Sequence, residues 1–520
     1  MARFYQPRLG QTDFGNSEAR PQITNQQGLS AQFDQRFEGH ALTSISAYRY
    51  QDFDIKNGGN YDQFYISNGG QQLWNRQLSQ ELRFASTPGA DKKLDYQIGG
   101  YYLDARVYSD DPSYYGPDAG AWNASNSQYN TLITNAAGRE LMRASLDGIY
   151  QSSVTDARVR SLAGYGQTDW HITNKATFTS GLRVTKERKT NRISQQLDRP
   201  GVDLAALGAA NGASAGQISA AQAIRANSVN TPFDFSNGEN IDAILTAWNL
   251  GPSYKLNDNV LLYSSVGRGI KSGVVAWTSS TSRVPSNLRS EKSLDYELGF
   301  KSLLFNRRLQ FNTNLYQTKI TDYQTQVSVL QSDGITYRNQ WTNAPGVKAR
   351  GIELESNLQA TKELALSANA SYNQAKYNGE FRVAKPDVDT SLSQYAGAAG
   401  TDNLDGKQLH NAPKRSLNVG ANYQAPVVGY LGRVTLSNSY LSGTYLATNQ
   451  AAFTWQKAYN ITNLSLGIGG LDKKWEISFV AKNLFDTKYA TSKGTYTSTG
   501  ATSYQIGAPR YLGLAFRSKL

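Results

Sequence analysis

Few residues of this chain could carry out acid–base or metal chemistry. The chain contains three histidines, His40, His171 and His410, and no cysteine. The histidines lie far apart at predicted turn or loop positions, so we expect them to be exposed to solvent and not to share a catalytic or metal site. The lack of cysteine excludes a disulfide framework and a thiolate nucleophile or ligand.

Catalytic motifs give little support for an enzyme. The sequence has no H-E-x-x-H zinc motif and no glycine-rich phosphate-binding loop. The adjacent carboxylates Asp110 and Asp111 suit a calcium ion or a charged surface better than catalysis. We therefore predict no enzymatic activity, and no catalytic, cofactor-binding or metal-ligating residue.

Residues suited to binding gather in three predicted outer loops. Aromatic rings offer a large rigid contact area with polar tips, and arginine pairs with carboxylate or catecholate-type groups. On this basis we predict as candidate ligand-contacting residues Tyr114, Tyr115, Trp122, Arg338, Trp341 and Trp455. The alternative is that these rings form an aromatic girdle or simply order their loops.

The elements that must position these loops show an alternation of apolar and polar residues. In residues 364–373, for example, Leu364, Leu366 and Tyr372 alternate with Ser367 and Asn373. This period of two predicts strands with one apolar and one polar face. No run of 18 or more apolar residues exists, which excludes a transmembrane helix but not a barrel, because only every second barrel residue faces lipid.

Connection lengths favour a membrane barrel over a soluble sandwich. We predict about 17 strands, whose connections alternate between short turns and long loops rich in Tyr, Asn, Ser and Gly. One long loop holds an Ala-rich stretch, residues 203–226, which could form a short helix. Short turns at one end and long loops at the other are typical of outer-membrane β-barrels. The fold class predicted is therefore all-β, an antiparallel transmembrane β-barrel with short periplasmic turns and long extracellular loops.

The charge of the chain adds little to this interpretation. The net charge is +12, but Lys and Arg are spread evenly, without the basic run typical of a nucleic-acid site. We expect no nucleic-acid partner. The positive charge could help contact with lipopolysaccharide phosphates or an anionic substrate.

Eight sequence stretches resemble TonB-dependent receptors, in the order in which that family carries them. They are LTSISAY at 42–48, QELR at 80–83, YSSVGRGIKSG at 263–273, residues 288–301, GIELE at 351–355, NAPK at 411–414, NLFDTKY at 483–489 and the last strand GAPRYLGLAFRSKL at 507–520. The resemblance covers about residues 28–520. It implies a 22-stranded barrel in the outer membrane of a Gram-negative bacterium, which imports a scarce ligand such as an iron–siderophore complex with energy from the TonB complex.

The resemblance also implies partners and a role for the lumen. The implied partners are outer-membrane lipid and lipopolysaccharide, the TonB complex, an iron–siderophore or similar small ligand, and the barrel-assembly machinery, which would recognise the C-terminal strand. In the family, charges of the lumen hold a plug domain inside the barrel. We expect Glu297, Lys301, Glu353, Glu355, Glu476 and Lys482 to form that polar network.

No signal peptide, TonB box or plug domain is recognisable before the strands. We therefore expect an N-terminally truncated receptor, with about 17 of 22 strands, residues 1–27 as an extracellular loop remnant and 28–520 as the barrel portion. Counting strand directions back from a periplasmic C-terminus places residue 1 outside, so an odd number of strands, five by difference, would precede it. The two edge strands would then run the same way. We expect this chain alone to lack TonB-coupled import. The alternatives are a passive porin-like channel and, with less support, an outer-membrane hydrolase.

Overall fold

One large antiparallel sheet forms the body of the protein. The computed structural model describes residues 22–55, 64–87, 93–234, 239–277, 285–330, 337–385, 400–496 and 501–519. Within them, seventeen strands pair one after another in chain order, as predicted from the sequence. They are β1 (Gln22–Phe37), β2 (His40–Ile55), β4 (Gln71–Ser86), β5 (Leu94–Tyr115), β6 (Tyr150–His171), β7 (Ala176–Arg199), β9 (Glu239–Asn257), β10 (Val260–Lys271), β13 (Glu291–Leu304), β14 (Leu309–Leu330), β15 (Tyr337–Gln359), β16 (Leu364–Tyr377), β19 (Arg415–Val427), β20 (Tyr430–Leu441), β23 (Tyr459–Gly469), β24 (Trp475–Lys482) and β27 (Tyr511–Ser518).

Two short strands complete the nineteen-stranded sheet. They are β3 (Ser67–Gly69), which pairs with β5, and β8 (Phe233–Asp234), which pairs with β7. Four hairpins lie outside this sheet: β11 (Val274–Trp277) with β12 (Pro285–Leu288), β17 (Arg382–Lys385) with β18 (Gly400–Asn403), β21 (Thr444–Tyr445) with β22 (Trp455–Gln456), and β25 (Ala490–Tyr496) with β26 (Ala501–Ile506). A 3-10 turn, η2 (Ala452–Thr454), precedes β22.

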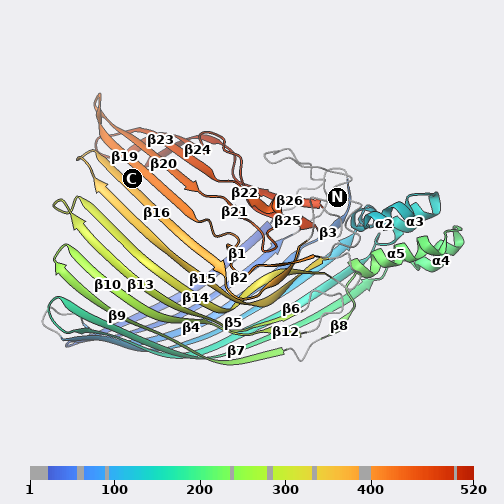
Figure 1. Ribbon diagram of the computed structural model, residues 1–520, viewed down its shortest axis with the longest axis horizontal. Coiled ribbons are helices and arrows are strands. Elements are labelled where there is room, and N and C mark those ends of the chain that lie inside the picture. Colours follow the sequence, from blue (N-terminus) through green and yellow to red (C-terminus); the bar gives the residue numbers. More distant parts are fainter. Residues whose placement is uncertain are drawn as a thin grey trace.

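The connections divide the sheet into a turn end and a loop end. Eight short connections join β1–β2, β4–β5, β6–β7, β9–β10, β13–β14, β15–β16, β19–β20 and β23–β24 at the turn end, on the left of Figure 1. Left-handed backbone makes such turns tight, as at Val428 (φ 49°) and Gly429 (φ 81°) between β19 and β20. The long connections all lie at the other end. This is the regular sorting of short and long connections that the sequence predicted.

The alternation of side chains gives the sheet one apolar and one polar face. On the apolar face Leu162, Leu182 and Leu298 are 61%, 53% and 58% exposed. The polar face is the concave one. The β11–β12 hairpin covers it and contacts β7 and β9 as well as β15, strands that β10, β13 and β14 separate in the sheet. A single hairpin can reach both sides only if the sheet curls toward it, and Figure 1 shows this curl.

The two edge strands of the sheet run in the same direction. Phe37 at the end of β1 pairs with His40 across a short turn, and Ser518 at the end of β27 pairs with Trp475 beside another. Both strands therefore run from the loop end to the turn end, as the strand count predicted. Among the described residues no backbone pairing joins β1 to β27, so the sheet forms an open, curled wall. Strand β1 begins at Gln22, before the expected boundary at residue 28.

A cluster of five helices projects from the loop end, on the right of Figure 1. It is built from two long connections and comprises α1 (Ala119–Asn123), α2 (Asn126–Leu132), α3 (Ala136–Ala144), α4 (Leu204–Ala210) and α5 (Ala215–Ser228). The sequence predicted one short helix within residues 203–226, and this was incomplete: two helices lie there, and three more lie between β5 and β6. Among the described residues, no helix combines the length and apolar composition needed to cross a membrane.

The helices hold together through a core of their own. Leu132, Leu141, Leu146 and Ile149 are fully buried there. The guanidinium of Arg225 in α5 donates hydrogen bonds to the carbonyl oxygens of Ala144, Ser145 and Val202 at 2.7–2.9 Å. It therefore ties α5 to the end of α3 and to the start of α4, and burial lowers the pKa of this guanidinium.

Candidate functional site

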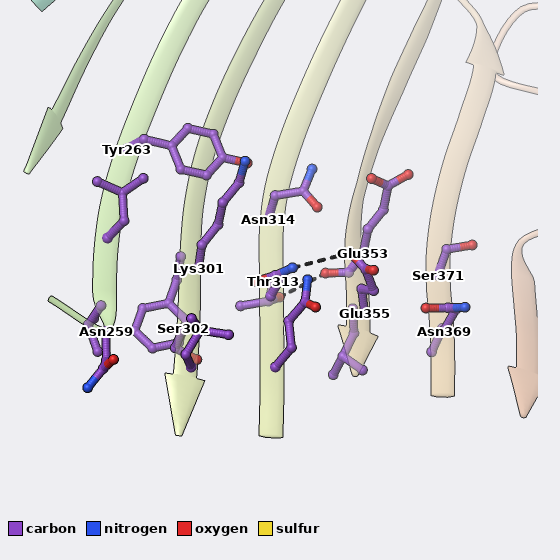
Figure 2. Close-up of a pocket in the computed structure, with 18 of the residues that line it drawn as sticks. Asn259, Tyr263, Lys301, Ser302, Thr313, Asn314, Glu353, Glu355, Asn369 and Ser371 are labelled. Carbon is purple, nitrogen blue, oxygen red and sulfur yellow. Dashed lines mark hydrogen bonds between the residues drawn. The ribbon is translucent and has the colours of Figure 1, made fainter. Parts of the chain in front are cut away.

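A polar groove runs along the concave wall near the turn end (Figure 2). Its volume is about 1030 Å³, and its lining comes from strands β9 to β19. The residues labelled in Figure 2 are Asn259, Tyr263, Lys301, Ser302, Thr313, Asn314, Glu353, Glu355, Asn369 and Ser371. Amides, hydroxyls and carboxylates dominate this list. Such a wall can form many hydrogen bonds with water or with a polar protein surface.

Tyr263 organises one side of the groove because its ring lies flat over a glycine. A Cβ atom on Gly299 would stand only 2.1 Å from the ring carbon Cζ of Tyr263. The hydroxyl of Tyr263 donates a hydrogen bond of 2.5 Å to Oε1 of Glu297. Nζ of Lys301 lies 5.2 Å from the ring centroid, a cation–π distance. The wall therefore holds a glycine, a tyrosine, a glutamate and a cation as one unit.

The same combination recurs on β6, which β7 and β9 separate from β10. The ring of Tyr165 lies over Gly99, its hydroxyl donates to Glu81, and the guanidinium of Arg183 lies 5.7 Å from the ring centroid. Tyr316 also lies over a glycine, Gly351, and donates to Oδ1 of Asn373 at 3.0 Å.

The lumen charges predicted from the sequence lie on this wall but in different places. Lys301, Glu353 and Glu355 line the groove, and Asn312 donates to Glu355 at 3.2 Å. For the carboxylate of Glu353 no hydrogen bond or ion pair is present among the described residues. Glu476 lies elsewhere on the wall, on β24, where it pairs with Arg433 at 2.8 Å, and Lys482 ends the same strand.

Two of the aromatic candidates have structural partners at the base of the helical cluster. Trp122 is only 8% exposed and packs in the cluster's core against Phe64, with 6.1 Å between the ring centroids. The hydroxyl of Tyr115 donates to the carbonyl oxygen of Ser228 at 2.9 Å. These contacts give both residues a packing role. Tyr114 is the second-last residue of β5, and its ring lies 5.0 Å from the guanidinium of Arg199.

The remaining candidates lie apart from this group. Trp341 on β15 is 46% exposed, and Trp455 on β22 is 42% exposed with its ring 4.9 Å from that of Tyr445. Arg338 also lies on β15, opposite Val329, but its side chain falls outside the described residues. The six candidates therefore do not form one cluster. Their contact with a ligand stays a prediction, and Trp341 and Trp455 are the exposed tryptophans among them.

Sequence reasoning missed the two loops that fold onto the concave wall. In one, Ser272 donates to Glu187, Lys189 donates to the carbonyl oxygen of Gly273 at 3.1 Å, and Gln324 donates to that of Ser272 at 2.9 Å. In the other, the β17–β18 hairpin packs Phe381, Val383 and Leu404 against Val347 and Tyr377. Both loops cover the wall between the groove and the loop end.

The histidines are half-buried, so the expectation of solvent exposure was wrong. His40 contacts the hydroxyl of Tyr96 at 3.2 Å, and His171 contacts Asp95 at 3.0 Å. His410 lies 3.0 Å from the hydroxyl of Tyr377, and burial lowers its pKa. His40 and His171 thus contact consecutive residues of β5 at the turn end, whereas His410 precedes β19 at the loop end. Among the described residues no three His, Cys, Asp or Glu side chains converge as a metal site.

Two further features bear on chemistry. Asp111 accepts hydrogen bonds from Gln71 and Ser109 at 2.8 and 2.9 Å, which gives that acidic residue partners within the protein. Residues 212–216 read Gly-Ala-Ser-Ala-Gly, the spacing of a nucleophile elbow, which the sequence analysis overlooked. The hydroxyl of Ser214, however, accepts the backbone N–H of Gln217 at 3.2 Å and caps α5. It acts as a helix cap, with no strand before it.

Comparisons with known proteins agree with this architecture. The ferric yersiniabactin uptake receptor FyuA from Yersinia pestis is 17% identical with a TM-score of 0.68, and the match covers 96% of this chain and 63% of that one. The siderophore receptor PiuA from Acinetobacter baumannii is 12% identical with a TM-score of 0.65, over 98% and 66% of the two chains. The copper transporter OprC is 11% identical with a TM-score of 0.59, over 95% and 65%.

At these identities the similarity concerns the fold. The chain spans slightly less than two-thirds of the length of each of these proteins. No curated protein matches its sequence. A family model described as TonB dependent receptor-like, beta-barrel matches residues 2–484. The chain therefore belongs to the family of TonB-dependent receptor-like β-barrels.

Proposed function

We propose that the protein is an outer-membrane receptor for TonB-energised uptake of a scarce ligand, with an iron–siderophore complex as the favoured ligand class. The observation that carries the proposal is the family match over residues 2–484, together with a polar concave wall in the matching fold. Members of this family are outer-membrane transport receptors and not enzymes, which confirms the sequence-based prediction against an enzyme.

The donor atoms of the chain favour a chelated metal over a bare soft ion. Copper ions bind best to thiolate, thioether and imidazole groups. The chain has no cysteine, two methionines and three histidines, and one of the methionines, Met142, is buried in the helical cluster. A metal complex that brings its own ligands needs only shape, aromatic contact and charge from the receptor. This supports a siderophore-like ligand, recognised by exposed aromatic rings such as Trp341 and Trp455 and by nearby arginines such as Arg338.

The remaining partners of the proposal follow from the same fold. The groove near the turn end offers a dense set of hydrogen-bonding groups, which supports its role as the seat of a folded plug. Lipid would contact the apolar face, and the barrel-assembly machinery would recognise β27, whose outward residues Leu512, Leu514 and Phe516 are 54–80% exposed.

Fluorescence titration of the purified protein tests the ligand class. We expect at least one ferric siderophore, of the catecholate, hydroxamate or carboxylate type, to quench tryptophan fluorescence saturably, and the iron-free siderophore to bind at least tenfold more weakly. Trp341→Ala and Trp455→Ala should each weaken binding several-fold. Trp170→Phe is the matched control, because Trp170 is 54% exposed at the turn end.

A passive channel would give a different result. It would show voltage-independent conductance in planar bilayers and no saturable binding of any ferric siderophore. That combination of results would contradict the proposed receptor function and favour a porin-like channel. Energisation is tested separately, by comparing ferric-siderophore uptake in cells with and without TonB. Uptake that is equal in both would contradict the TonB-energised part of the proposal.

A further inference from the structure

Three lysines stand side by side on the apolar face near the loop end. Lys319 on β14 is the direct cross-strand partner of Lys348 on β15, and Lys348 is the direct partner of Lys376 on β16. We call these three residues the lysine row. Lys319 and Lys348 are exposed, and Lys376 is half-buried. Neighbours on the same strands, such as Val347 and Tyr377, are buried against the concave side, so the row points outward.

Nothing among the described residues neutralises the lysine row. No ion pair within the described part of the chain involves Lys319, Lys348 or Lys376. Of the acidic residues of these strands, Glu353 and Glu355 line the groove on the opposite, concave face, and Asp322 pairs with Arg289 at 2.6 Å. The nearby guanidinium of Arg350 donates to Gln374, which carries no charge. Like charges directly opposite each other destabilise a sheet, so this arrangement calls for an anion from outside the chain.

Another part of the same face shows how the chain balances such a contact itself. Arg106 on β5 and Arg158 on β6 are also direct cross-strand partners. There, Arg106 forms a bidentate pair with Asp156 at 2.7 Å, and Arg158 pairs with Asp104. Each arginine thus has its own carboxylate on the neighbouring strand. The lysine row has the same geometry of opposed cations without the carboxylates.

The position of the row matches the outer edge of the lipid-facing band. Lys319 lies ten residues along β14 from Leu309 at the turn end. At about 3.3 Å per residue this is roughly 33 Å along the strand, or about 25 Å in height for a strand tilted by roughly 40°. The apolar band of such barrels is about 25 Å tall.

Apolar side chains lie further toward the turn end. The next outward-facing row, Gln317, Arg350 and Gln374, is polar. Below it, four residues from the lysine row on each strand, Leu315, Ile352 and Tyr372 are 53%, 42% and 43% exposed. Further down, Leu366, Val419 and Leu436 line an apolar groove of about 590 Å³ on the same face. An occupant of the lysine row would therefore have its anionic group among the lysines and its hydrocarbon against these side chains.

We propose that the lysine row binds the phosphate groups of a phosphorylated glycolipid in the outer leaflet of the membrane. The leaflet at the loop end is the outer one, and in Gram-negative bacteria its major lipid carries acyl chains below phosphates on a sugar head. Three adjacent ammonium groups supply the charge and donors for such phosphates. The inference depends on the membrane orientation of the barrel and not on which ligand the protein imports.

Native mass spectrometry of the detergent-solubilised full chain tests the proposal. The probe is diphosphoryl lipid A, compared with its dephosphorylated form, phosphatidylglycerol and inorganic phosphate. We expect lipid A to be retained at least tenfold better than each comparator. The triple variant Lys319→Gln, Lys348→Gln, Lys376→Gln should lose at least tenfold in retention. The matched control is Lys175→Gln, Lys362→Gln, Lys474→Gln, which removes three exposed lysines from turns at the other end and should retain lipid A as well as the wild type.

Each result decides the question. Equal retention by the lysine-row variant overturns the site. Equal retention of phosphatidylglycerol overturns the assignment of a glycolipid. Full displacement of lipid A by millimolar inorganic phosphate overturns the claim that the site needs the hydrocarbon part of the ligand. Should the variant fail to fold, the wild type alone decides, because equal binding of phosphorylated and dephosphorylated lipid A contradicts a phosphate site.

Discussion

Truncating Leu141 should open the helical cluster without weakening the sheet. Leu141 is fully buried in the cluster's core, and its Cδ1 lies 3.4 Å from where a Cβ on Gly208 would stand. The helices around it, α2 and α3, have seven and nine residues, and helices of that length do not hold in water without packing. Leu141→Ala removes packing that these helices need, so they should lose protection together.

The expected size of the effect follows from the burial. Fully buried Leu→Ala changes destabilise by about 2–5 kcal/mol. At about 1.4 kcal/mol per factor of ten, amide exchange in α2, α3 and α5 should accelerate by roughly 30-fold to a few thousand-fold, until local opening is complete.

Hydrogen–deuterium exchange with mass spectrometry measures this directly, with peptides of β13–β15 as the internal reference. The control is Val202→Ala, because Val202 is 52% exposed and surface changes stay within about 0.5 kcal/mol. Unchanged exchange in α3 of the Leu141 variant would refute the reasoning about its core. Equal acceleration in β13–β15 would refute the independence of the cluster from the sheet.

Three other predictions concern the wall, an ion-pair set and a loop. Gly299→Ala places a Cβ 2.1 Å from the Tyr263 ring and should destabilise the wall by about 1–3 kcal/mol, measured as a lower midpoint of urea unfolding. Adding Tyr263→Ala should restore most of the lost stability. A double variant as unstable as Gly299→Ala would argue against the clash. Asp156→Asn leaves the opposed Arg106 and Arg158 with one carboxylate fewer and should cost about 1–2 kcal/mol, between exposed and buried ion pairs, with a larger loss at low salt; an equal midpoint at all salt concentrations would contradict this. Burial lowers the pKa of His410 below 6.5 in the folded loop, so on acidification the open loop binds a proton before the folded loop does. The stability of the folded loop is therefore fully present above about pH 6.5 and is lost as the pH falls from that value toward the folded pKa. Hydrogen–deuterium exchange in residues 404–414 should rise on acidification, and His410→Gln should remove this rise.

The strands could be predicted from the sequence because their signal is local. Alternation such as that of residues 364–373 needs no distant partner, and tight turns such as Val428-Gly429 interrupt it at once. Counting these turns gave both the number of strands and the common direction of β1 and β27. The charges of the wall followed from the same alternation, because a strand fixes which face each residue takes.

The helical cluster and the folded-in loops depend on contacts that sequence spacing does not reveal. The helices are short, and the burial of Trp122 and Leu141 depends on a core to which several connections contribute residues. One local signal was available: Ser125 with Gln128, and Ser214 with Gln217, form capping boxes at the starts of α2 and α5. No such signal marks the bond between Ser272 and Glu187, which lie 85 residues apart.

The histidines show the same limit on a smaller scale. His40 and His171 stand at strand ends, which predicts exposure. Their partners Tyr96 and Asp95 come from a strand that follows or precedes them by more than 50 residues. Burial at these positions is thus a property of the sheet and not of the local sequence.

Where a tyrosine ring lies flat over a glycine from a distant part of the chain, the two positions should change together in evolution. In Gly99 with Tyr165 and Gly299 with Tyr263, the ring atoms are the nearest obstacle to a side chain on the glycine, whereas at Gly351 the backbone carbonyl oxygen of Tyr372 stands nearer than the ring of Tyr316. In the first two pairs, substitution of the glycine is therefore tolerated only after the ring has been replaced, whereas the ring can be lost first. Among homologues that share this wall, the tyrosine should be replaced by a smaller residue before the glycine is substituted. A tyrosine at these positions should therefore rarely face a residue other than glycine. Each pair then records the order in which its two mutations occurred.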